Sequence, residues 1–162
     1  MPKGRIKPKS QYGIQLEEKQ ELRGTYALRE TQFRRYFKAG STPEEIVQTL
    51  ELRLDNVVYR AGFAITIRAA RQLVSHGHIQ LNEKNVNIQS LQVALNDVVR
   101  ISHRSRGKNI FKDLVTTLKK YEPPTWLSLD KSELTVKVTG RPTTTDPIII
   151  GRIRPVIEFY SR

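Results

Sequence analysis

Residues 50–101 read LELRLDNVVYRAGFAITIRAARQLVSHGHIQLNEKNVNIQSLQVALNDVVRI, and this stretch sets the architecture of the chain. In its first half the apolar residues recur at about the 3.6-residue period of helices. The second half changes to the short alternating runs of strands, and acidic residues are few throughout. The stretch therefore predicts a compact α+β module with arginines on its surface, which is typical of RNA binding.

A helix begins just before this stretch. Thr42 can cap it and Glu45 can close a capping box with Thr42. The apolar period continues to residue 61, where Gly62 suits a left-handed helix end. We expect one uninterrupted helix over residues 43–61.

A second helix begins after Thr66, which can cap it, and stops at Gly77. Its inward positions are Ile67, Ala70, Leu73 and Val74. Its outward positions are Arg68, Arg71 and Ser75. Arg53 and Arg60 share one edge of the first helix, so the pair of helices predicts a basic surface whose spacing suits two backbone phosphates.

Strand patterns follow the second helix. They cover residues 79–81, 86–88, 98–101, 127–129 and 134–138. Residues 82–85 and the pair Asn96-Asp97 have the composition of turns, so the first runs form hairpins. The strands predict one small, mostly antiparallel sheet.

The remaining segments predict a second, helical domain of an α+β chain. Helical patterns cover residues 13–22, 29–38 and 110–121, and apolar runs at 148–150 and 156–160 should return to pack on the N-terminal helices. The predicted organisation is a basic extended arm over residues 1–12 and a helical domain over 13–50 that 147–162 completes. The RNA-binding module is inserted as residues 51–146.

The charge is unevenly distributed. The 162 residues carry a net charge of +12, with ten basic and four acidic side chains in residues 1–40 and nine and two in residues 60–112. A solvated basic face could explain one such block. Two blocks separated by a net acidic stretch indicate contact with a polyanion.

The N-terminal residues lack the apolar core of a signal peptide, no run of residues is long and apolar enough to span a membrane, and cysteine is absent. We expect a cytoplasmic protein without structural zinc and without a cofactor, and an organellar form stays open.

Several motifs resemble a known family. RLDNVVYRAGF, ARQLVSHGHI and VNI in the 50–101 stretch resemble the S-four RNA-binding domain. YGIQLEEKQELR, QFRRYF and the ending VIEFYSR resemble the flanking segments of bacterial-type small-subunit ribosomal proteins of the S-four family. These matches extend from about residue 12 to the end of the chain.

The resemblance implies a structural ribosomal protein. Members of the family bind small-subunit rRNA at a junction of helices in its 5′ domain, nucleate assembly of the subunit body, and lie with neighbouring proteins where mRNA enters. Some also repress their own translation. The resemblance therefore implies rRNA, neighbouring small-subunit proteins and nearby mRNA as partners, with no membrane.

The resemblance places eight residues against RNA: Arg34, Arg35, Arg53, Arg60, Arg68, Arg71, His76 and His78. The basic blocks add Lys3, Arg5, Lys7, Lys9, Tyr12, Lys19, Arg23 and Lys84. For His76 and His78 a role as simple turn residues remains an alternative.

The chain also departs from the family pattern. Typical members begin with a further basic segment, often with zinc-binding cysteines, whereas this sequence starts close to its YGIQL block. Glu17 and Glu21 stand where basic residues are common, which predicts weaker RNA contact by that helix. Glu83 replaces a usual glycine and predicts a different hairpin turn.

Two other functions can be weighed against this one. A free-standing RNA-binding factor with the same domain should lack QFRRYF and VIEFYSR, and both are present. An RNA-modifying enzyme needs convergent acid, base and nucleophile groups, but no carboxylate pair, cysteine or further histidine accompanies His76 and His78 at a suitable spacing. We expect no catalytic residues.

Overall fold

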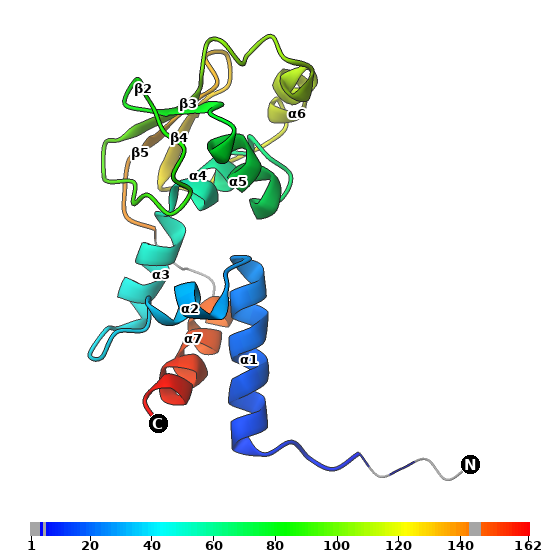
Figure 1. Ribbon diagram of the computed structural model, residues 1–162, viewed down its shortest axis with the longest axis vertical. Helices are drawn as coiled ribbons and strands as arrows, with labels where there is room; N and C mark the ends of the chain where they lie inside the picture. Colours follow the sequence, from blue (N-terminus) through cyan, green and yellow to red (C-terminus); the bar gives the residue numbers. More distant parts are fainter. Residues whose placement is uncertain (1–3, 5, 143–146) are drawn as a thin grey trace. The chain divides into compact units, whose positions relative to one another are not determined.

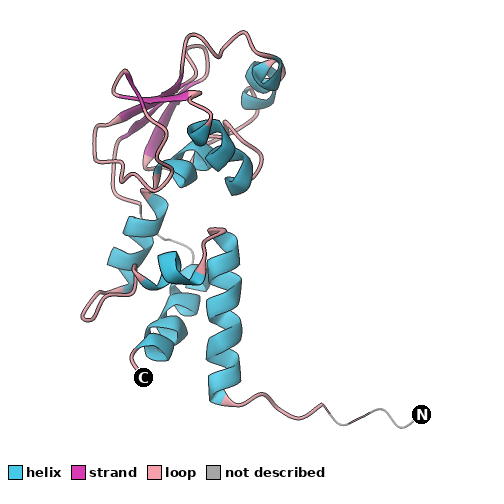
Figure 2. Ribbon diagram, in the orientation of Figure 1, coloured by secondary structure: helices cyan, strands magenta, loops and turns pink. Residues whose placement is uncertain are grey.

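The computed structural model describes residue 4, residues 6–142 and residues 147–162, with side chains from 151 onward in the last range. The chain forms two compact units. Unit 1 is Met1–Ile46 with Thr144–Arg162, and unit 2 is Val47–Thr143. Unit 1 is helical, whereas unit 2 combines helices with a sheet, so the chain is α+β as predicted (Figures 1 and 2).

Unit 1 is built on helix α1 (Gln11–Thr25), helix α2 (Glu30–Arg34) and helix α7 (Pro147–Tyr160). The hydroxyl of Ser10 accepts a hydrogen bond from the backbone N–H of Gly13 at 3.1 Å and caps α1. The helix therefore begins at Gln11, inside residues 1–12, which were predicted to form an extended arm. Helix α2 is shorter than the predicted 29–38.

Helix α7 packs against α1 as predicted for the C-terminal segment (Figure 1). The rings of Tyr12 and Phe159 lie 5.5 Å apart, and the side-chain amide of Gln15 donates to a Glu158 carboxylate oxygen at 2.9 Å. Ile153 and Val156 are fully buried. The predicted packing of residues 156–160 is confirmed, while the side chains of 148–150 lie outside the described residues.

The predicted single helix over residues 43–61 is wrong. Helix α3 (Pro43–Glu51) ends, and helix α4 (Leu54–Arg60) begins after Arg53, whose backbone is extended. Arg53 pairs instead with Gln92 in an isolated β-bridge. Apolar residues recur at the helical period on both sides of the break, and no glycine or proline marks it.

The predicted helix-end signals at Thr42, Gly62, Thr66 and Gly77 are confirmed. The Thr42 hydroxyl accepts from the Glu45 N–H at 3.3 Å and a Glu45 carboxylate oxygen accepts from the Thr42 N–H at 3.0 Å. Thr66 caps helix α5 (Ile67–Ser75) by accepting from the Ala69 N–H at 3.0 Å. Gly62 and Gly77 both adopt positive φ, at 83° and 77°.

The sheet of unit 2 has five antiparallel strands in the order β2-β1-β3-β5-β4. The strands are β1 (Ile79–Leu81), β2 (Lys84–Asn85), β3 (Val98–Ile101), β4 (Leu127–Asp130) and β5 (Thr135–Val138). Val99, Ile101, Val136 and Val138 form one buried core with the apolar faces of α4 and α5. The two late strands complete the sheet, as the sequence predicted.

The predicted strand over residues 86–88 is wrong. β2 ends at Asn85, and the chain then runs without regular structure to β3, with Ile88 more than half exposed. The carbonyls of Leu91 and Gln89 accept from the backbone N–H groups of Leu54 and Asp55 at 2.8 and 3.1 Å. This loop therefore satisfies the first free N–H groups of α4, which local alternation could not reveal.

The predicted helix over residues 110–121 is two short pieces, the 3-10 helix η1 (Asn109–Phe111) and helix α6 (Leu114–Leu118). Phe111, Leu114 and Leu118 are buried as predicted, but Ile110 and Val115 are exposed. The Tyr121 hydroxyl donates to the Arg60 carbonyl at 2.7 Å, which turns the chain after α6 back over α4.

The first hairpin is closed by a tight turn at Asn82 and Glu83. Leu81 pairs with Lys84, and both turn residues have positive φ, 48° and 69°. Two-residue turns with positive φ match the twist of a hairpin and favour asparagine followed by glycine. Glu83 therefore holds a backbone conformation that suits glycine better.

We expect Glu83→Gly to stabilise the protein by about 0.5 to 1 kcal/mol, because relief of the left-handed strain exceeds the conformational entropy that glycine loses. The exposed contact of Glu83 with Arg100, at 3.6 Å, contributes little. Urea unfolding measures the change. Lys84→Gly, at the adjacent strand residue, should instead destabilise, and a less stable Glu83→Gly would show that the Arg100 contact outweighs the strain.

Candidate nucleic-acid interface

A buried carboxylate organises the basic side of unit 2. Asp55, at the start of α4, is 1% exposed. Arg53 donates to it through Nε and Nη2 at 3.1 and 3.0 Å, and Arg71 on α5 donates through Nε at 2.8 Å. The Asn56 N–H adds a fourth bond at 2.8 Å. Asp55 therefore ties the break before α4 to the middle of α5.

A second buried carboxylate holds Arg60. Glu51, at the end of α3, accepts two bonds from the Arg60 guanidinium, each at 3.0 Å. The Asn56 side-chain amide donates to the same carboxylate and to the Glu51 carbonyl, both at 2.8 Å. This bidentate ion pair fixes the orientation of the Arg60 guanidinium. The Arg60 side chain as a whole is 30% exposed.

These networks revise the arginine surface that the sequence predicted. Arg53 is 4% exposed and faces Asp55, so the structure does not support it as a surface contact. Arg71 was expected to project outward beside Arg68, but its side chain is 22% exposed and is held by Asp55. A buried aspartate needs cationic partners, and helical spacing could not show that α5 supplies one of them.

The outward face of α5 carries a stripe of polar side chains, Arg68, Gln72 and His76, spaced four residues apart and all exposed. Arg68 takes part in no ion pair among the described residues. Its guanidinium is thus available to an external anion, and the stripe runs along the length of the helix.

His78 is buried, unlike its neighbour His76. Its Nδ1 lies 2.8 Å from the Ser105 hydroxyl, which in turn accepts from the Ser102 hydroxyl at 2.8 Å. Burial lowers the pKa of His78, and the positive charges of Lys108 and His76 lower it further. A neutral ring can accept from Ser105, so His78 serves the fold. The structure does not support it as an RNA contact.

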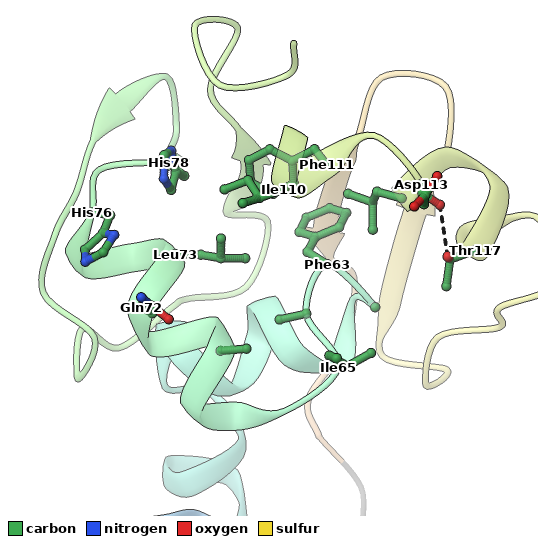
Figure 3. A pocket seen from close by; sticks show the side chains of 14 residues that line it. Phe63, Ile65, Gln72, Leu73, His76, His78, Ile110, Phe111, Asp113 and Thr117 are labelled. Carbon is green, nitrogen blue, oxygen red and sulfur yellow. Dashed lines mark hydrogen bonds between the residues drawn. The ribbon is translucent and has the colours of Figure 1, made fainter. Parts of the chain in front are cut away.

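A groove with a volume of about 510 Å³ lies beside the α5 stripe (Figure 3). Ala69, Gln72, Leu73 and His76 of α5 form one side. The segment 62–65, His78 and residues from 110 to 117 form the rest. Its lining is mainly apolar, and Gln72, His76, His78, Asp113 and Thr117 supply polar groups (Figure 3).

The predicted contacts in unit 1 divide into exposed and internal residues. Lys7, Lys9, Arg34 and Arg35 are exposed, and Tyr12 is half exposed. Lys19 is 6% exposed, pairs with Glu30 at 3.1 Å and lies over the Phe159 ring, so it serves the fold of unit 1 instead. Arg23 bonds the Gln20 side chain at 2.9 Å. Lys3 and Arg5 lie outside the described residues.

Lys84 is exposed at the edge of the sheet, as a contact residue requires. Sequence reasoning left out Arg104, Lys108 and Lys112, which are also exposed. They belong to the basic block of residues 60–112, so their charge was the available signal. The quoted motifs end before them, which is why they were not selected.

No group of three or more metal-ligating side chains occurs among the described residues. In the described part of the chain, no helix has the length and apolar composition that a membrane crossing needs.

Comparison with known proteins agrees with this geometry. Residues 52–99 match the S4 domain, and residues 2–55 match the Ribosomal protein S4/S9 N-terminal domain. The chain is 42% identical over 158 residues to small ribosomal subunit protein uS4 of Heliobacterium modesticaldum, with 94% of this chain and 76% of that protein covered. The uS4 protein of Persephonella marina is 43% identical, with coverages of 98% and 80%.

The fold and the matches define an RNA-binding protein of the S4-domain class. The matches extend over both units, so they identify one family within this class. The chain belongs to the family of small ribosomal subunit protein uS4. This is a family of structural ribosomal proteins and not of enzymes, and it is the family that the motifs predicted.

Arg68 and Arg71 of α5 should respond very differently to charge reversal. We expect Arg71→Glu to destabilise unit 2 by about 3 kcal/mol, because it places a carboxylate against the buried Asp55 and removes one of its partners. Arg68→Glu makes the same change in net charge but should alter stability by less than about 0.5 kcal/mol. Urea unfolding compares them, and equal stabilities would contradict the role given to Asp55.

The neutral state of His78 predicts a dependence of stability on pH. The unfolded chain takes up a proton at this ring below a pH of about 6.5, whereas the folded chain resists it. The free energy of unfolding should therefore fall as the pH drops below about 6.5, by at most about 1.4 kcal/mol per pH unit. Unfolding measured from pH 7.5 to pH 5.5 should show a shallower slope in His78→Gln. The exposed His103 provides the control, since His103→Gln should keep the wild-type slope.

Proposed function

We propose that this protein is a structural component of the small ribosomal subunit that binds the rRNA of that subunit directly. The observation that carries the proposal is the 42% identity to a uS4 protein over 94% of this chain. Exposed cations on both units support it, because phosphate contacts supply most of the affinity of proteins for RNA. Neighbouring small-subunit proteins are the other expected partners.

Within unit 2 the proposed contacts start from α5. Arg68 and His76 lie on its exposed stripe, and Arg60 and Arg71 add partly exposed side chains that buried carboxylates hold in place. Guanidinium groups fixed in this way lose little conformational entropy when they bind a phosphate. We add Lys84, Arg104, Lys108 and Lys112 as cations around this surface.

We propose that unit 1 contributes a second contact, through the basic residues that precede α1 and through Arg34 and Arg35. The domain organisation proposed from the sequence is an arm over residues 1–12, a helical domain over 13–50 with 147–162 and an RNA-binding module over 51–146. It places one cationic block in the arm and helical domain and the other in the RNA-binding module. Two cationic blocks on one chain can hold two RNA segments together. This property suits a protein that binds a junction of helices in the 5′ domain and nucleates assembly of the subunit body.

Two finer roles complete the proposal. We propose that the protein lies where mRNA enters the subunit. Exposed cations that do not contact rRNA could there contact the phosphates of mRNA. We also propose that the Glu17 and Glu21 carboxylates reduce RNA contact along α1. Glu17 pairs with Lys9 at 2.6 Å and Glu21 with Arg152 at 3.5 Å, which neutralises two cations inside unit 1.

Binding to a transcript of the 5′ domain of small-subunit rRNA tests the proposal. The logarithm of the association constant should fall with the logarithm of salt concentration with a slope steeper than about −4, since each neutralised phosphate contributes about 0.7 to 0.9. A slope near zero would refute it. Arg68→Glu should weaken binding by at least about tenfold, equal to about 1.4 kcal/mol, because repulsion replaces a phosphate contact.

The matched control for Arg68→Glu is Lys137→Glu, which changes the net charge equally. Lys137 is exposed on β5 between two buried valines, so it points away from the face that α4 and α5 cover. Lys137→Glu should weaken binding less than about threefold. Equal losses in the two variants would mean that overall charge, and not the α5 surface, controls binding.

A further inference from the structure

Two apolar side chains stand exposed at the groove beside α5. Ile65 is 88% exposed and Ile110 is 60% exposed, and both line the groove (Figure 3). Exposed apolar residues that gather around a depression commonly mark a binding surface. The volume of about 510 Å³ lies within the range of about 300 to 1,000 Å³ that small-molecule sites occupy. Contacts between cations and phosphates do not explain this apolar groove.

The groove has apolar walls and polar ends. Leu73 and the two isoleucines occupy the middle, whereas Gln72 and His76 lie at one end and Asp113 and Thr117 at the other (Figure 3). Gln72 can donate and accept, and the Asp113 carboxylate accepts. The Thr117 hydroxyl donates to the Asp113 carbonyl at 2.9 Å, so it can accept from a ligand. A ligand of matching chemistry is flat and apolar on its faces and carries donors and acceptors at its edges.

Positive charge flanks the groove. Arg68 is one residue before Ala69 of the wall, and Lys108 and Lys112 bracket the η1 residues Ile110 and Phe111. All three cations are exposed. Among the described residues that line the groove, Asp113 alone is acidic. The charge pattern suits a ligand with a phosphate on each side of its apolar part.

We propose that this groove binds one unstacked nucleobase of the RNA that α5 contacts, between the α5 wall and the Ile65 and Ile110 side chains. The inference rests on the proposed function, because the phosphates on either side of the base are those of the bound rRNA. Bases in loops and junctions are often unstacked, and apolar side chains stack on them without regard to sequence. The polar ends of the groove then select among base edges.

A protein partner would match the chemistry of the groove less well than a base. An apolar side chain of a partner could fill the walls, but it would leave Gln72 and Asp113 without hydrogen bonds, and losing such bonds is unfavourable. The groove also shares α5 with the proposed phosphate contacts. A base whose own backbone crosses Arg68 reaches the groove without any additional molecule.

Filling the groove tests the inference in the whole 162-residue chain. Ala69 lines the groove and is only partly buried, so Ala69→Leu should occupy the space of the base without disturbing the helix or the charge. With the 5′-domain transcript as probe, Ala69→Leu should bind about tenfold more weakly, which is the effect of losing about one stacked base. The salt slope should stay that of the wild type, because no phosphate contact is lost.

The matched control is Ser75→Leu, which adds a leucine at an exposed position of the same helix that does not line the groove. It should bind like the wild type. If urea unfolding shows Ala69→Leu to be destabilised, Ile65→Ser replaces it, since an 88% exposed side chain contributes little to the core. Ile65→Ser should weaken binding about threefold with an unchanged salt slope.

Each outcome has a separate meaning. Unchanged affinity in both groove variants would overturn the inference and leave the proposed function standing. A loss of affinity together with a shallower salt slope would also overturn it, because phosphate contacts would then be what the variant removed. Normal binding to the transcript but poor retention in reconstituted small subunits would assign the groove to a protein partner. A wild-type protein that does not bind the transcript would refute the proposed function and the inference together.

Discussion

The burial of Asp55 against two arginines is the constraint on which unit 2 depends. A carboxylate that is 1% exposed must have its charge matched and its lone pairs bonded, and Arg53, Arg71 and the Asn56 N–H provide this. Arg53 can reach Asp55 only if the chain is extended between α3 and α4. Arg71 can reach it only if α5 crosses close to the start of α4. One buried charge thus fixes a helix break and a helix packing.

The same constraint governs which cations can contact RNA. Arg53 is buried inside the fold, while the side chains of Arg60 and Arg71 are held by carboxylates and remain 30% and 22% exposed. Arg68 is exposed and is not drawn into these networks. The proposed binding surface is therefore rigid where the carboxylates hold it and adaptable at Arg68. Beside it, the exposed Ile65 and Ile110 give the surface an apolar component that charge counting does not reveal.

Much of this organisation could be read from local signals. Thr42 with Glu45, Thr66, Gly62 and Gly77 marked helix ends correctly, because capping and left-handed termination depend on neighbouring residues alone. The break at Arg53 and the irregular segment after Asn85 were missed. Both follow from hydrogen bonds between residues 52–55 and 89–93, about forty positions apart, and no local pattern contains that information.

The amino-acid order alone established an α+β chain, two basic blocks, the positions of most helices and strands, and the family, because composition, periodicity and short motifs are local properties. Which cations are exposed to solvent is not a local property, because it depends on tertiary packing. Lys19, Arg53 and His78 look like contact residues in the sequence, yet each is turned inward. Lys19 and His78 face Glu30 and Ser105 from other segments, and Arg53 faces the buried Asp55 because the chain bends before α4. The groove likewise exists only where α5, the segment 62–65 and η1 meet, because a surface made by three separate segments is defined by their packing.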